Sequence, residues 1–270
     1  MRLAIDYFGR CRALCRERGF GRIEVGSTHM LGAIRRYLLN GEKALANLRD
    51  TVAMAERVGN FRTQMVALNI LGELLVDAAQ PDEACQALTK ALELAETFDN
   101  TRYRAYVLYE LGRARYAGND AQATLEQALG FSRKVGMRFI GPRVLAALAL
   151  VSEQHRGAAL AEGEGIVKDG CLAHNALWFY RDAMEANLRA RDLDGVRGCA
   201  SALADLTRAD PLPWSEFFIE RGCALARYQA GERDRALFEK LRNLRAEAER
   251  GGLKAAIPQI DAALAEKPTH

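Results

Sequence analysis

The amino-acid sequence predicts an all-α protein, a right-handed superhelix of stacked helical hairpins that forms an α-solenoid. Leu-Gly pairs recur at a constant spacing, and each is followed by a small and then a large residue on the next predicted helix. Apolar residues recur at steps of three and four, which is the period of a helix, and no run alternates as a strand would. A fixed period of this length is typical of helical-repeat arrays. The pairs and their followers are Leu31-Gly32 with Ala44 and Leu48, Leu71-Gly72 with Ala84, Leu88 and Ala91, and Leu111-Gly112 with Ala121, Leu125 and Ala128.

Helix-ending and turn residues divide the chain into segments of roughly 15 residues, which favours short helices joined by tight turns. Pro81 with Asp82 and Glu83 suits a first helical turn, because proline loses no needed donor there and the acids face the positive end of the helix dipole. The breakers are Asn40-Gly41, Gly59-Asn60, Gln80-Pro81, Asp99-Asn100, Gly118-Asn119, Gly136, Gly170, Ala209-Asp210-Pro211, Gly231 and Gly251-Gly252. We therefore expect a single domain over 1–270, with a half-repeat at 1–18, helix pairs at 20–58, 60–98, 100–136, 137–169, 172–208 and 212–250, and a capping helix at 253–266.

The glycine of each Leu-Gly pair lies in the middle of a predicted helix, where it costs about 1 kcal/mol relative to alanine. This cost is acceptable if the second helix of the hairpin approaches closely. Ala44 and Ala84 follow their glycines at the same distance along the chain and are the expected small contacts. The third gap, from Gly112 to Ala121, is shorter, which predicts a first helix reduced by about one turn.

Composition and charge favour a cytoplasmic protein with a full core. The net charge of +3 is too small to indicate nucleic acid or an anionic membrane as a partner. The sequence shows no apolar signal segment, and its longest purely apolar run, 144–151, is too short to cross a bilayer. The six cysteines are scattered through helical patterns, so we expect reduced, mainly buried thiols.

Metal-binding and catalytic patterns are weak, and we expect no catalytic residue, no metal and no cofactor. Cys11 and Cys15 stand one turn apart on one helix without a third ligand nearby, so packing is favoured over metal binding. Asp182 and Glu185 also lie one turn apart, and surface ion pairs with neighbouring arginines, Arg181 and Arg189, are favoured over acid–base chemistry.

A partner-binding groove is the main candidate site. In repeat arrays the first helix of each pair lines the concave face, and tyrosine and arginine are frequent anchors at interfaces. Packing between repeats is the competing interpretation. The residues that the repeat places toward the groove are His29, Arg36, Tyr37, Asn69, Glu73, Tyr106, Tyr109, Arg113 and Tyr116.

A second candidate surface is aromatic. Trp178 and Phe179 are adjacent, and adjacent residues of a helix cannot all face one side. One or more of the group must point toward a neighbouring repeat, which is favoured, or toward a partner. The patch comprises Trp178, Phe179, Arg181 and Trp214.

The repeat signature resembles the tetratricopeptide repeat, although the spacing from Gly32 to Gly72 exceeds the usual period of that family. Longer stretches resemble the C-terminal repeat region of bacterial signalling proteins that join a class III adenylate/guanylate cyclase domain, an ATPase domain of the signal-transduction type and a tetratricopeptide-like tail. These stretches are DYFGRCRALCRERGFGRIEV (6–25), FIGPRVLAALALV (139–151), HNALWFYRDAMEANL (174–188) and RADPLPWSEFFIERGCALA (208–226). The resemblance covers only the tail, because this chain has no glycine-rich phosphate loop and no segment that aligns with a cyclase domain.

The sequence thus favours a non-catalytic protein- or peptide-interaction module, the regulatory or scaffolding part of an ATPase/cyclase-linked signalling system. The alternative is a stand-alone, transcription-factor-associated regulator that senses a ligand or peptide. The expected partner is a protein or peptide, neither nucleic acid nor membrane, and the exposed ends of such an array also predict weak self-association. The partner, the signal, the oligomeric state and membership of a larger protein do not follow from the sequence.

Overall fold

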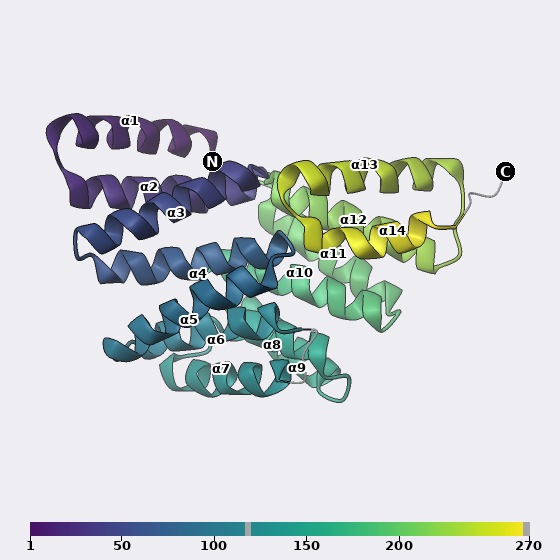
Figure 1. Cartoon of the computed structure of the whole chain (residues 1–270). Coiled ribbons are helices and arrows are strands. Elements are labelled where there is room, and N and C mark those ends of the chain that lie inside the picture. Colours follow the sequence, from purple (N-terminus) through teal and green to yellow (C-terminus); the bar gives the residue numbers. More distant parts are fainter. Residues whose placement is uncertain (117–119, 267–270) are drawn as a thin grey trace.

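The computed structural model describes residues 1–116 and 120–266, and within them the chain is helical throughout (Figure 1). These residues form fourteen α-helices and two short 3₁₀ helices, with no strand. Each helix packs against the next along the chain, as in an α-solenoid. The all-α prediction is therefore confirmed, whereas the expected turn at Gly118-Asn119 lies outside the described residues.

The helices alternate between two layers. α2, α4, α6, α8, α10 and α12 contact one another in succession and form the inner layer, while the intervening helices pack on their outside. The bounds are α1 (Arg2–Arg18), α2 (Gly21–Arg35), η1 (Arg36–Leu38), α3 (Gly41–Arg57), α4 (Phe61–Asp77), α5 (Pro81–Thr97), α6 (Thr101–Ala114), α7 (Ala121–Val135), α8 (Gly141–Val151), α9 (Arg156–Lys168), α10 (Ala173–Arg189), α11 (Leu193–Thr207), α12 (Pro213–Gln229), α13 (Arg235–Gly251), η2 (Lys254–Ala256) and α14 (Ile257–Leu264).

Helices of equal length produce the period of the sequence. Gly19, Leu39, Gly59, Ala79 and Asp99 stand at equal intervals, each just beyond a helix end and each with a positive φ between 46° and 73°. A left-handed residue at this position turns the chain and satisfies the last helical carbonyls. α3, α4 and α5 each contain 17 residues. A helix with its turn therefore fills one such interval, and a hairpin fills two, which is the spacing of the Leu-Gly pairs.

The repeat glycines allow a close approach of two helices, but the nearest side chains are leucines and not the expected alanines. A Cβ on Gly72 would lie 2.5 Å from Leu88 Cδ2, and Leu88 is completely buried. Gly32 faces Leu48 and Gly112 faces Leu125 in the same way. The large residue of the repeat signature thus fills the space that the glycine leaves. α6 has 14 residues where α4 has 17, in line with the shorter third gap.

The two ends of the array meet, which the sequence did not predict. α12 contacts η1, α13 contacts α3, and η2 contacts α4. Gly41 lies so close to Gly251 that a Cβ on Gly41 would come within 2.7 Å of the Gly251 carbonyl oxygen. The rings of Tyr37 and Trp214 pack edge to face with centroids 5.9 Å apart. The solenoid therefore closes on itself, and the inner faces of its first helices surround one interior.

Candidate functional site

The predicted groove residues lie on the inner layer but are mostly covered. Seven of the nine are buried, and the side chains of Glu73 and Tyr109 have no exposed surface. The other two, His29 and Tyr116, are partly exposed. The face that the sequence assigned to a partner is occupied by the chain's own side chains, chiefly those of α8 and α10.

One half of this interior is a cluster of ion pairs around Arg143 of α8. The guanidinium of Arg143 donates to Glu73 at 2.9 Å, to Glu110 at 2.7 Å and to the hydroxyl of Tyr106 at 2.5 Å. Glu73 also accepts a hydrogen bond from Arg36. Because Arg143 and both carboxyl groups have no exposed surface, each depends on the others for the hydrogen bonds that water would supply.

The other half joins the end of α4 to the middle of α10. Asp77 accepts hydrogen bonds from Arg113 at 3.0 Å and from Arg181 at 3.2 Å. Arg181 also pairs with Asp182, at 2.7 Å from its Nε and 2.5 Å from its Nη2. The other carboxylate oxygen of Asp182 accepts the hydroxyl of Tyr109 at 3.0 Å. These contacts tie together three inner helices that are far apart in sequence.

The indole of Trp178 lies between the two halves. The guanidinium carbons of four arginines lie over this ring, at 4.1 Å for Arg181, 4.5 Å for Arg143, 5.1 Å for Arg113 and 5.8 Å for Arg36. Cation–π attraction is strongest where water is excluded, as it is around this buried ring. Trp178 therefore holds several like-charged groups together that would otherwise repel one another.

The two central carboxyl groups have opposite pKa shifts. Burial alone would raise the pKa of Glu73, but Arg36 and Arg143 outweigh it and lower this pKa to about 2. Burial raises the pKa of Glu110 to about 8, and the charge of nearby Glu73 adds to the rise. Glu73 is thus the ionised member of the pair at neutral pH, and Glu110 is largely protonated.

The predicted aromatic patch is also interior. Trp178, Phe179, Arg181 and Trp214 are all buried. The two tryptophan rings lie 4.9 Å apart and join α10 to α12. The patch thus packs between repeats, which was the favoured of its two interpretations.

Several members of the network were not recognised in the sequence. Arg181 and Asp182 form a buried pair, so the expectation of a surface ion pair between them is wrong. Arg143, Glu110 and Asp77 carried no prediction at all. A usable signal was present, since Arg143 and Glu110 are single charges within apolar helical runs, which predicts a distant buried partner.

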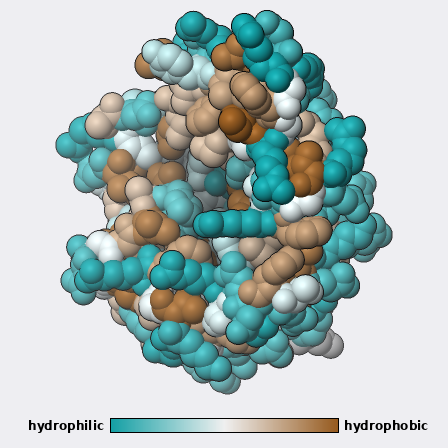
Figure 2. Space-filling view, turned by 90° about the vertical axis from the view of Figure 1, so that its left-hand side faces the viewer, coloured by the Kyte–Doolittle hydropathy of each residue, from teal (hydrophilic) through white to brown (hydrophobic). Residues whose placement is uncertain are grey.

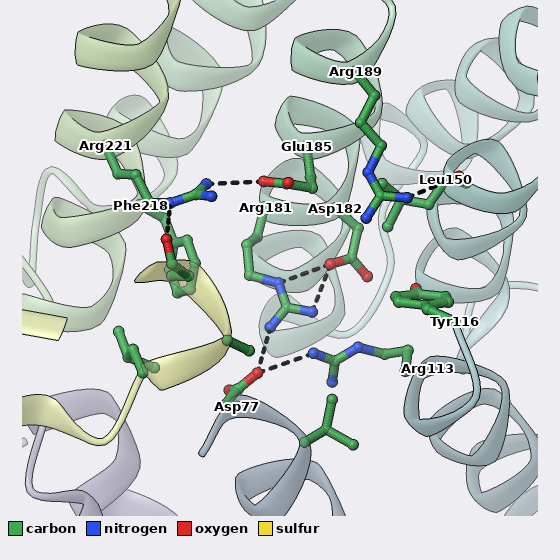
Figure 3. A pocket seen from close by; sticks show the side chains of 14 residues that line it. Asp77, Arg113, Tyr116, Leu150, Arg181, Asp182, Glu185, Arg189, Phe218 and Arg221 are labelled. Atoms are coloured by element: carbon green, nitrogen blue, oxygen red, sulfur yellow. Dashed lines mark hydrogen bonds and ion pairs between the residues drawn. The ribbon is translucent and has the colours of Figure 1, made fainter. Parts of the chain in front are cut away.

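A cavity of about 130 Å³ lies beside the network, at the carboxyl ends of the inner helices (Figure 3). Asp77, Arg113, Arg181 and Asp182 form one wall. Glu185, one turn after Asp182 on α10, also lines the cavity, and it pairs with Arg221 at 2.8 Å and not with Arg189 as expected.

Arg189 and Tyr116 are the polar residues of the cavity with the fewest interactions within the chain. Arg189 is exposed, and its guanidinium donates to the carbonyl of Leu150 at 3.3 Å. The hydroxyl of Tyr116 is buried and has no hydrogen-bond partner within the described part of the chain. Together they offer donors to a small acidic or polar molecule.

No grouping of three or more potential ligands among the described residues is placed to hold a metal ion. The sulfur atoms of Cys11 and Cys15 lie 4.0 Å apart, and all six cysteines are free thiols. Only Cys15 is fully buried and the other five are partly exposed, so the expectation of mainly buried thiols is wrong. None of the described helices combines the length and apolar character needed to cross a membrane.

No protein-family model matches this chain, and no curated protein matches it. Its function is therefore inferred from the geometry and from the residues themselves.

Proposed function

We propose that this chain is a non-catalytic module that binds a protein or peptide partner, as the regulatory or scaffolding part of an ATPase/cyclase-linked signalling system in the cytoplasm. The proposal treats the solenoid as a right-handed, tetratricopeptide-like superhelix. The sequence stretches that resemble the tail of such signalling proteins support the link to signalling. Six free cysteines support a reducing compartment.

The observation that carries the proposal is the position of the exposed apolar side chains. Eleven large apolar side chains are exposed among the described residues, and seven of them belong to residues 1–30. They are Met1, Leu3, Tyr7, Leu14, Phe20, Ile23 and Met30. Figure 2 shows the end of the molecule where α1 passes into α2, with apolar surface over its upper part. A concentration of this kind marks an interaction surface.

The filled interior also favours partner binding on α1 and α2. The arginines of the network already pair with carboxylates of the chain, so a partner that entered there would have to break buried ion pairs. Removing one partner of such a pair costs about 3–5 kcal/mol. Docking on α1 and α2 breaks no described pair among buried groups, so we assign partner binding to these helices and not to the interior.

Site-specific photo-cross-linking tests this proposal. A photoreactive amino acid at position 7 or 14 of the full chain is expected to capture a defined partner in the source cell. The control positions are Glu83 and Lys90, which are exposed on α5, a second helix of the internal repeats. Equal capture at positions 83 and 90, or the same captured partners from a chain with a photoreactive group at Tyr109, would contradict the proposal.

A ligand-sensing regulator is the second candidate, and the cavity beside Asp77 favours it. The exposed guanidinium of Arg189 and the unpartnered hydroxyl of Tyr116 suit a small molecule with a carboxylate. Thermal-shift screening with small carboxylic acids is the test. Stabilisation that disappears in Arg189→Met would support this candidate, and stabilisation that survives would place binding elsewhere.

A further inference from the structure

Asn69, near the middle of α4, is a buried residue whose amide is unpaired. Only 1% of its surface is exposed, and neither its Oδ1 nor its Nδ2 forms a hydrogen bond within the described part of the chain. Tyr109 holds the equivalent position one repeat later, and its hydroxyl donates to Asp182 at 3.0 Å. An unpaired buried amide lowers the stability of a fold, so Asn69 points to a hydrogen-bonding partner from outside the chain.

Asn69 lines a cavity of about 330 Å³. Apart from Met1, the walls of this cavity come from α2, η1, α4, α6 and the first turn of α10, and α4 contacts both α2 and α6. Apolar side chains, among them Ile34, Val66 and Ile70, form much of the lining. Small-molecule sites have this character, with volumes from about 300 Å³ upward and a few polar groups in a mainly apolar wall.

Other polar groups of the cavity are hydrogen-bond donors. The Nε of Arg36 is buried and has no partner among the described residues. The hydroxyl of Tyr37 accepts from Arg36 at 3.0 Å. The hydroxyl of Tyr106 accepts from Arg143 at 2.5 Å, and each of the two hydroxyl groups keeps its own proton for a further bond. Together with the amide of Asn69, these groups fit a ligand that presents several acceptors and one donor.

Charge favours a neutral ligand. Arg36 already pairs with Glu73, so an anion in the cavity would compete with this carboxylate. Burial, together with the charges of Arg143 and Arg36, lowers the pKa of His174 to about 4, so this lining residue is neutral at pH 7. The lining contains no carboxylate, so a cation would lie near Arg36 without compensation.

The aromatic rings of the lining favour a planar ligand. The rings of Tyr103 and Tyr106 are inclined by 24°, with centroids 6.2 Å apart, and both residues line the cavity. Stacking on tyrosine suits any flat heteroaromatic ring. The amide of an asparagine is also matched to one such ring, because its acceptor and its donor pair with the amino group and the adjacent ring nitrogen of adenine.

We propose that this cavity binds a neutral adenine base, free or as its nucleoside, through the amide of Asn69. Oδ1 accepts a hydrogen bond from the exocyclic amino group, and Nδ2 donates to the neighbouring ring nitrogen. The Nε of Arg36 and the hydroxyl of Tyr106 supply donors for the remaining ring nitrogens. No described ion pair has to break. This small-molecule site is distinct from the cavity beside Asp77 and goes beyond the interaction function above.

Isothermal titration calorimetry of the full chain with 9-methyladenine tests the proposal. The methyl group blocks the ring N–H, so the exocyclic amino group is the only hydrogen-bond donor of this probe. We expect 9-methyladenine to bind. We expect 9-methylpurine, which has the same ring nitrogens but no amino group, to bind at least about tenfold more weakly, because it leaves Oδ1 of Asn69 without a donor.

Asn69→Leu separates a ligand-binding role from a structural one. Leucine has a similar size and no polar group, so the free chain should unfold at a higher temperature once the unpaired amide is removed. The same variant should bind 9-methyladenine at least about tenfold more weakly. Asn187→Leu is the matched control, because Asn187 is also buried but its amide pairs with Arg156 and Cys199. This control should lower the unfolding temperature and leave the affinity unchanged.

Several outcomes would overturn the proposal. Absence of 9-methyladenine binding, or equal binding of 9-methylpurine, removes the adenine site. A lower unfolding temperature of Asn69→Leu together with an unchanged affinity would make Asn69 a structural residue. Asn69-dependent binding of benzoate that is tighter than the binding of 9-methyladenine would make the cavity an anion site instead.

Discussion

Gly72→Ala offers the sharpest test of how the repeats pack. In an open helix, alanine in place of glycine gains about 1 kcal/mol of helix propensity. At position 72 the added Cβ would lie within 3.0 Å of three side-chain carbons of Leu88, closer than real Cβ contacts. Leu88 has no exposed surface, so other side chains of the core enclose it. Overpacking of this kind costs about 1–3 kcal/mol, and with so close a contact we take the upper value. The net expectation is a loss of about 2 kcal/mol.

Gly130→Ala is the matched control, because Gly130 also lies within a helix but has no neighbouring side chain within 4 Å of the position that a Cβ would take. We expect this variant to gain up to about 1 kcal/mol. Urea unfolding followed by circular dichroism therefore separates two chemically identical substitutions by about 3 kcal/mol. Gly72→Leu should cost more than Gly72→Ala, about 2–4 kcal/mol. A gain in stability for Gly72→Ala equal to that of Gly130→Ala would refute the close helix–helix contact.

Three further predictions concern the interior network, a turn and catalysis. Glu73→Gln should cost about 3–5 kcal/mol because it leaves Arg36 and Arg143 without their carboxylate, whereas Glu110→Gln should be nearly neutral below pH 4.5 and stabilising at pH 7, as urea midpoints will show. The folded-state pKa of Glu110, about 8, lies above its ordinary value of 4.5. The contribution of protonated Glu110 to stability is therefore complete below pH 4.5 and is lost as the pH rises through 8. The wild-type chain should lose this contribution between pH 4.5 and pH 8, whereas Glu110→Gln should not. Ala79→Gly should stabilise by about 0.5–1 kcal/mol, measured by thermal unfolding, because Ala79 is exposed and has a φ of 58°. The purified chain should neither hydrolyse ATP nor form cyclic nucleotides in a coupled assay, and turnover of either kind would contradict the non-catalytic function.

The parts of the fold that the sequence predicted are local. Helix ends depend on a few neighbouring residues, such as Pro81 at the start of α5 or Gly59 after α3. The positions of the hairpins can therefore be predicted from the local sequence. The glycines were recognised as close contacts for the same reason. Their partners were misassigned, because the choice between Ala84 and Leu88 depends on the rotation of one helix about its axis.

The closure of the array and the filled interior could not be predicted in this way. Gly41 and Gly251 meet because small rotations between successive repeats add up over the whole solenoid, and no local pattern records their sum. The same accumulation brings Arg143 to Glu73 and Arg181 to Asp77. When the first three repeats are considered alone, their inner face is therefore predicted to be an open groove. In the whole array, side chains from the later helices cover this face and form a buried network with it.

Hydrogen–deuterium exchange tests most directly whether the partner docks on α1 and α2 or in the interior of the solenoid. The exchange of the full chain is measured alone and when saturated with the partner captured by cross-linking. Slower exchange in α1 and α2, with unchanged exchange in α4, α6 and α10, is the predicted result. Slower exchange in α6 and α10 with α1 unaffected would contradict it, because the partner would then occupy the interior that the chain fills with its own charges.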